Sequence, residues 1–169
     1  LFSYTRMIFQ REKAKRCLLE EFPEQVIKRV GDSLSLIDDV LEPYADAFAI
    51  IQNANYESTT EAGEINRFIK WMHRIDNSDW VPPAILFMSQ WQNSNQTEYI
   101  RWFFEKLERL AAYMHVCARN VNQRIERYAE LLAELEGKHG PEQPLQTIEL
   151  RQNEKEEMLQ ALNGNVYEL

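Results

Sequence analysis

The chain has 169 residues, of which 44% are hydrophobic and 27% charged, and its net charge is −8. This length suits one domain with a single core, and the composition excludes the disordered and fibrous classes. Only 5 Gly and 6 Pro interrupt the sequence, so long helices are favoured over short strands and turns. The prediction is an all-α fold, an irregular multi-helix bundle of about six to eight helices.

The compartment follows from what the sequence lacks. No apolar run approaches the roughly 20 residues that cross a bilayer, and no signal segment opens the chain, so no membrane association is expected. Cys17 and Cys117 are isolated, without the spacing of a redox or zinc motif, which favours a reducing cytoplasm. Because the chain begins with Leu1 and stops at Leu169 just after a predicted turn, we expect a single helical domain that is a fragment of a longer protein.

The first predicted elements lie in residues 1–57, the N-terminal helices. One helix is expected over residues 4–30, with Pro23 as a kink or break and Gly31 as its stop. Its predicted apolar positions are Phe9, Leu18, Leu19, Phe22 and Val26. Asp32 or Ser33 then caps a second helix, which Pro43 kinks or restarts. Its predicted apolar positions are Leu34, Leu36, Ile37, Val40, Leu41, Ala45, Phe48, Ala49 and Ile51, and a polar loop follows over residues 53–59.

Residues 58–137 are expected to form the core helices. Thr60 opens a helix in which Ile65, Phe68, Ile69 and Met72 form one buried stripe. A short buried helix over residues 84–91 follows two prolines at its first turn. Ser94 or Asn95 caps the strongest helical pattern, over residues 100–117, which is predicted as the core helix. After a bend expected at Arg119 and Asn120, the periodicity runs on to Gly137, either as a further antiparallel helix or as a long continuation.

Residues 138–169 are predicted to be a C-terminal loop and helix. Gly140, Pro141 and Pro144 form the loop, and residues 151–162 form a helix that ends at Asn163 and Gly164. Residues 166–169 could begin a further element. Spacings differ between helix pairs, which disfavours a solenoid.

Few residues point to catalysis or metal binding. His73, His115 and His139 have no second ligand at helical spacing, so metal binding is improbable. Acidic groups such as Asp38 with Asp39, and Glu154, Glu156 and Glu157, are better explained as solvated helix faces than as acid-base pairs. No glycine-rich phosphate loop, serine elbow or Cys/His nucleophile pattern occurs. We therefore expect no catalytic residues, no metal and no cofactor in this chain.

Basic residues offer candidate DNA contacts. Residues 1–30 carry seven Lys or Arg against four Glu, a net charge of +3, so the remaining residues carry a net charge of −11. An acidic body is a poor surface for phosphates, so the first helix is the better candidate. Arg101, Arg109, Arg119, Arg124 and Arg127 form a second group, but interleaved glutamates favour local ion pairs there. The candidate DNA contacts are Arg6, Arg11, Lys13, Lys15, Arg16, Arg124 and Arg127.

The four tryptophans have two explanations. Trp71, Trp80, Trp91 and Trp102 spread across the centre of the chain, several of them amid apolar helix positions. Packing between helices is favoured over a platform on which bases stack.

The order of motifs resembles a known family. FIKWMHRIDNSDWVPPAILFM is followed by FFEKLERLAAYMHVCARNVNQRIERYAELLAEL and by MLQALNGNVYEL. Over residues 65–169 the sequence resembles the helical region of the GmrSD-type modification-dependent restriction endonucleases. The matching positions are Asp79, Trp80, Pro83, Leu86, residues 107–110, Arg124, Tyr128, Leu162, Asn163, Gly164, Val166 and Tyr167.

The resemblance implies a bacterial anti-phage defence protein that uses nucleotide hydrolysis and cuts foreign, often base-modified, DNA. The family combines an N-terminal nucleotide-using domain with, often, a C-terminal His-Me finger nuclease. Neither the Asp-Gly-Gln-Gln-Arg type motif of the first nor the histidine motif of the second occurs here. The resemblance implies a catalytically silent helical module that orients the other domains of its parent chain, with DNA contact as a second expected role.

Two other functions stay open. One is a helical protein–protein interaction or scaffold domain, motivated by the acidic composition and the missing site. The other is a small DNA-binding regulator that uses the basic first helix, although no helix-turn-helix pattern is evident. The expected partners are other domains of the parent chain, with DNA and a second copy of the chain as further candidates.

Overall fold

The computed structural model describes residues 1–137, 139–143 and 145–164, and all regular structure within them is helical. Eight continuous helical segments occur in these residues, which agrees with the predicted all-α fold. They are α1 (Phe2–Gln10); α2 (Leu18–Phe22), η1 (Pro23–Ile27) and α3 (Lys28–Val30) in one run; α4 (Ser33–Ser35), η2 (Leu36–Leu41) and α5 (Glu42–Asn53) in another; α6 (Ala62–Met72); α7 (Val81–Trp91); α8 (Thr97–Val116); α9 (Val121–Glu136); and α10 (Gln152–Asn163). None of the described helices is long and apolar enough to span a membrane.

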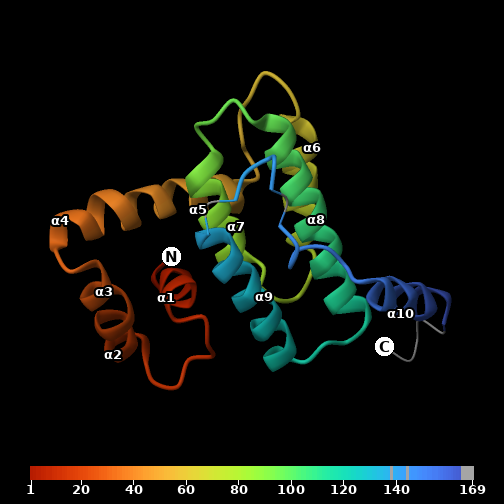
Figure 1. Cartoon of the computed structure of the whole chain (residues 1–169), viewed down its shortest axis with the longest axis horizontal. Helices are drawn as coiled ribbons and strands as arrows, with labels where there is room; N and C mark the ends of the chain where they lie inside the picture. Colours follow the sequence, from red (N-terminus) through yellow and green to blue (C-terminus); the bar gives the residue numbers. More distant parts are fainter. Residues whose placement is uncertain (138, 144, 165–169) are drawn as a thin grey trace.

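Helix α7 lies at the centre of the bundle, with α5, α8 and α9 around it and the N-terminal helices to one side (Figure 1). Every residue of α7 from Val81 to Met88 is buried. The sequence predicts residues 100–117 as the core helix, and α8 does contribute many buried side chains, but α7 occupies the middle. A helix that is apolar on every side shows no stripe, which is why periodicity points to α8 instead.

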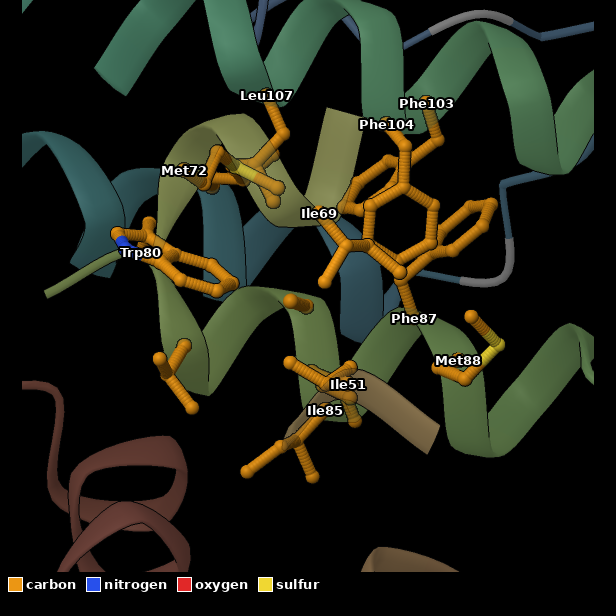
Figure 2. Close-up of a cluster of buried hydrophobic side chains, with 14 of the residues drawn as sticks. Ile51, Ile69, Met72, Trp80, Ile85, Phe87, Met88, Phe103, Phe104 and Leu107 are labelled. Atoms are coloured by element: carbon orange, nitrogen blue, oxygen red, sulfur yellow. The ribbon is translucent and has the colours of Figure 1, made fainter. Parts of the chain in front are cut away.

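One hydrophobic cluster joins the three predicted regions. Figure 2 shows Ile51 of α5, Ile69 of α6, Phe87 of α7 and Phe104 of α8 converging on the same space. Ile8, Val40, Leu145 and Ile148 add side chains from the two ends of the described chain. Full burial of a side chain of this size is worth about 1.5–3 kcal/mol, so this cluster dominates the stability of the bundle.

The N-terminal region differs from the prediction of one helix over residues 4–30. Helix α1 ends at Gln10, where Arg11 adopts a left-handed conformation and donates its backbone N–H to Met7. Residues 11–16 contain no large apolar side chain, so a helix there would have nothing to bury. The next helix begins at Leu18, and Leu19, one of the predicted apolar positions, is 87% exposed.

The two internal prolines neither break nor restart their helices. Pro23 begins the wide turn η1, and Pro43 is the second residue of α5, which continues from η2. A proline cannot donate a backbone hydrogen bond, and a wide turn with longer hydrogen-bond spacing accommodates that loss without ending the helix. Gly31, with a φ of 95°, ends the first run, and Asp32 caps the second by accepting the Ser35 N–H at 2.9 Å, as predicted. Leu34 and Ile37, two of the predicted apolar positions of this second helix, are 70% and 53% exposed.

Two predicted helix starts move by one or two residues. Helix α6 follows Glu61 rather than Thr60, and α8 follows Gln96, whose backbone N–H is bonded to Ser94 Oγ. Asn120 separates α8 from α9 and caps α9 through a reciprocal pair with Gln123, which confirms the predicted bend. The polar cap satisfies amides that would otherwise lack partners at the first turn.

The C-terminal part is attached by polar contacts. Glu134 of α9 accepts the backbone N–H groups of Gln146 at 2.7 Å and Thr147 at 2.9 Å, which holds the loop before α10. Helix α10 itself has no buried residue and extends from the side of the bundle (Figure 1). The predicted features at Pro144 and at residues 166–169 lie outside the described residues.

Candidate functional site

Asp79 and Arg124, two positions of the predicted resemblance, form an ion pair. Arg124 of α9 donates through Nε to Asp79 Oδ2 at 2.6 Å, and both side chains are about four-fifths buried, at 19% and 24% exposure. The same guanidinium donates through Nη1 to the Arg119 carbonyl at 2.6 Å. Arg124 therefore ties the residue before Trp80 and α7 to the turn between α8 and α9.

Two buried aromatic residues stand behind this pair. Tyr128, one turn after Arg124, is 1% exposed, and its burial raises the pKa of its phenol, with the Asp79 carboxylate adding to the rise. Trp80 is 1% exposed, lies edge-on to His73 at 5.3 Å, and its indole N–H has no hydrogen-bond partner among the described residues. The carboxylate is thus fixed by a neighbouring cation against a packed wall, an arrangement that suits a structural joint better than a general base.

A small cavity of about 170 Å³ adjoins the pair, between α1, the start of α7 and α9. Its wall consists of Ser3, Tyr4, Arg6, Met7, Lys13, Ala14, Ser78, Asp79, Pro82 and Ile125. Sites for cofactors and drug-sized ligands usually measure about 300–1,000 Å³. This cavity is therefore too small for a nucleotide.

Most of the candidate DNA-contacting residues are paired within the chain. Six of the seven have a carboxylate partner: Arg6 with Glu21, Arg11 with Glu136, Lys15 with Glu12, Arg16 with Glu24, Arg124 with Asp79, and Arg127 with Glu154. Lys13 has no hydrogen bond or ion pair with any described residue. DNA contact by these residues stays a prediction.

A residue that the sequence analysis does not single out organises the first group. The Glu21 side chain is 2% exposed and accepts the backbone N–H groups of Lys15 at 2.8 Å and Arg16 at 3.0 Å. These bonds, with that of Lys15 the largest contribution, hold the pKa of the Glu21 carboxyl below its usual value. Arg6 faces the same carboxylate at 3.2 Å. Residues 11–17, which we call the basic loop, are therefore held in place by one buried carboxylate.

Two arginines of the second group, Arg119 and Arg127, pair with carboxylates of α10. Arg127 donates to the Glu149 carbonyl at 2.9 Å and to Glu154 at 3.4 Å. Arg119 is bonded to Glu157, which also accepts the Tyr113 hydroxyl at 3.0 Å. These contacts correct the expectation that Glu154 and Glu157 lie on a solvated face, because both carboxylates attach α10 to α8 and α9.

A larger hollow of about 340 Å³ lies between α8, α9 and the start of α10. Its charged residues are Arg119, Arg127, Arg151, Glu126, Glu130 and Glu154. Three cations face three anions, so the hollow has no net charge that would select a phosphate.

The histidines and cysteines stay apart. His115 lies 3.6 Å from Asp76, and His73 lies 2.9 Å from the Ile51 carbonyl. Both cysteines are free thiols, Cys17 exposed and Cys117 half-buried. Within the described residues, no three His, Cys, Asp or Glu side chains gather in a way that could hold a metal ion.

The four tryptophans differ in how far they are buried. Trp80 is fully buried, while Trp91 and Trp102 are half-buried on either side of Tyr99, with ring centroids 5.0 and 5.5 Å away. Trp71 is the most exposed of the four, at 39%, and its ring lies 5.2 Å from the Arg67 guanidinium. Packing between helices is confirmed for Trp80, which is buried. It holds in part for Trp91 and Trp102, which are half-buried.

Comparisons of the chain with protein-family models, with curated proteins and with solved structures return no match.

Proposed function

We propose that this chain is a catalytically silent helical module of a bacterial restriction-type, anti-phage DNA endonuclease. In this role it orients the catalytic domains of its parent chain and contacts DNA through the basic loop. The proposal begins from the resemblance over residues 65–169 and needs the chain to behave as one rigid body.

The contact between Asp79 and Arg124 carries the proposal. These two positions belong to different stretches of the resemblance, 45 residues apart, and they meet at 2.6 Å. Two other matching positions, Trp80 and Tyr128, are buried beside them. A joint of this kind supports the proposed orienting role, because it locks the start of α7 against α9 and the preceding turn.

The proposed DNA contact falls to the exposed part of the basic loop. Lys13, Lys15 and Arg16 are exposed, whereas Arg6 and Arg127 are buried against carboxylates. Phosphates need cations that they can approach, so the exposed residues are the better candidates.

The first test has two parts. Purified chain incubated with modified duplex DNA, Mg²⁺ and nucleoside triphosphates is expected to show neither cleavage nor hydrolysis, and robust cutting would overturn the proposal. The native reading frame around the chain is then sequenced for an upstream Asp-Gly-Gln-Gln-Arg type motif or a downstream His-centred nuclease motif. Start and stop codons close to both ends would favour a stand-alone interaction protein.

The DNA contact has its own test. Replacing Lys13, Lys15 and Arg16 by Ala is expected to weaken binding to a duplex and to reduce its salt dependence, since each lost phosphate contact lowers the slope by about 0.9. The matched control replaces three other exposed cations, Lys28, Lys70 and Lys155, by Ala. Equal loss in both triple variants would show attraction without a defined contact.

A scaffold or interaction domain outside restriction is the second candidate. It is favoured by exposed apolar side chains in the N-terminal region, such as Leu19 at 87% and Leu34 at 70%. Binding to another protein would cover such side chains. The small DNA-binding regulator has less support, because Arg6 and Arg11 of the first helix region both pair within the chain.

A further inference from the structure

The helix that includes α4, η2 and the start of α5 carries an unusual distribution of charge. No Lys, Arg or His occurs between Val30 and Asn66, while Asp32, Asp38, Asp39, Glu42 and Asp46 all lie on or beside this helix. All five carboxylates are exposed. None forms an ion pair with a described residue. We call residues 32–46 the acidic arm.

The acidic arm also exposes apolar side chains. Leu34 is 70% and Ile37 is 53% exposed, and they are three positions apart in the sequence, so they lie on neighbouring positions of one helix face. The inner side of the arm is covered, because Val40 is 7% exposed and Leu36 packs against the core. Figure 1 shows the arm extending away from α7, with its outer end at α4 free of other helices.

Leu34 and Ile37 are therefore an apolar pair with unpaired carboxylates directly after it, at Asp38 and Asp39. A wide turn, η2, lies at this place, and such turns occur often at functional positions of helices. A partner that binds here therefore needs two properties. It needs apolar side chains that pack on the apolar pair, and it needs cations around them that pair with the carboxylates.

We propose that the acidic arm is a docking surface for a basic amphipathic helix of another protein segment. Leucine-type side chains of that helix cover Leu34 and Ile37, and its Lys or Arg residues pair with Asp38, Asp39 and Glu42. The charge of the arm argues against other occupants: nucleic acid and anionic lipid carry the same sign, and two arms facing each other would repel.

This inference deepens the proposed function by naming the chemistry of a partner, and it rests on that function only in treating the chain as a module that joins other protein parts. The binding test below needs no DNA and no catalytic domain. Its failure would leave the cleavage and DNA-binding tests standing, and failure of those tests would leave this one standing.

The probe is a synthetic peptide of about five helical turns, made of Leu and Lys with Leu at helical spacing. A second peptide has the same composition with Leu scattered around the helix, and a third replaces Lys by Glu. Fluorescence anisotropy measures binding of each labelled peptide to the whole chain. We expect the first peptide to bind at least about tenfold more tightly than the other two, and raised salt to weaken it.

Variants locate the surface. Leu34→Ser with Ile37→Ser is expected to weaken binding at least about tenfold, with helix content unchanged by circular dichroism. The matched control is Leu159→Ser with Leu162→Ser, a pair with the same spacing on α10 and similar exposure, 59% and 54%. That control is expected to change binding less than about twofold.

Three results would overturn the proposal. Equal binding of the ordered and scattered peptides, or equal loss in both double variants, would show that only charge attracts the peptide. Sedimentation that reveals a dimer abolished by the Leu34 and Ile37 substitutions would assign the surface to a second copy of the chain.

Discussion

The N-terminal residues 1–30 and the helices α6 to α9 are held in place by different kinds of contact. In the central helices the buried side chains are apolar, and Phe87, Phe103 and Phe104 stack or meet edge-on. The buried polar or charged residues among those described, Thr5, Arg6 and Glu21, all lie in the N-terminal part. Apolar burial does not depend on direction, whereas a buried carboxylate needs its partners in defined positions.

The two regions should therefore respond differently to pH and salt. The centre is expected to tolerate changes of pH and salt, because its energy comes from area removed from water. The N-terminal part is expected to respond to both, because its basic loop is held through a charged group. The following predictions test that contrast, from the largest expected effect to the smallest.

The largest effect is expected in the centre. Phe103 is fully buried and stacked on Phe87, so Phe103→Ala removes contacts and leaves a cavity. The free energy of unfolding should fall by about 3–5 kcal/mol, measured by urea denaturation. A loss below about 1 kcal/mol would mean that the centre is loosely packed.

The ion pair at the candidate site should come next. Arg124→Ala leaves the Asp79 carboxylate and the Arg119 carbonyl without their donor, which is expected to cost about 1.5–3 kcal/mol of stability. Arg109→Ala, whose side chain is 57% exposed, is the control and should cost under about 0.5 kcal/mol. A double-mutant cycle with Asp79→Ala then isolates the pair, and additive losses would contradict a direct coupling.

The pH dependence should come from the N-terminal part. The folded pKa of Glu21 lies below 4.5, the usual value of a glutamate carboxyl, so its charged form stabilises the fold above that value. This contribution is lost as the pH falls below about 4.5 and through the folded pKa. Glu21→Gln should therefore be less stable than the parent chain at pH 7, and the difference should shrink with acid.

Hydrogen exchange at the Lys15 and Arg16 amides provides the local measurement, because both bonds end on Glu21. Exchange there should accelerate in Glu21→Gln while amides of α8 stay protected. The control is the exposed neighbour, Glu20→Gln. Unchanged exchange at both loop amides would show that the loop is held by something else.

The smallest effect is expected at a residue that its sequence pattern places inside. Leu19 is 87% exposed, so Leu19→Ala should change the free energy of unfolding by less than about 0.5 kcal/mol. A loss near 2 kcal/mol would show that Leu19 is covered in solution.

Local pattern predicted much of this fold. In α6, Ile65, Phe68, Ile69 and Met72 recur at three and four residue steps, and all four are buried. Asp32 and Asn120 cap the starts of helices with their side chains, at the predicted cap and the predicted bend. Gly137, which has no side chain, follows the last residue of α9, also as predicted. These features depend on residues within one or two turns, so the sequence by itself determines them.

Other features depended on partners far along the chain. The basic loop interrupts the predicted helix over residues 4–30 because residues 11–16 have nothing to bury, and Glu21 holds their backbone instead. Asp79 pairs with Arg124, which lies 45 residues later in the sequence. The pairing follows from how α7 packs against α9. Only the tertiary structure decided which charges are buried in pairs and which remain exposed, because that choice depends on the distance between helices and not on the spacing of residues within one.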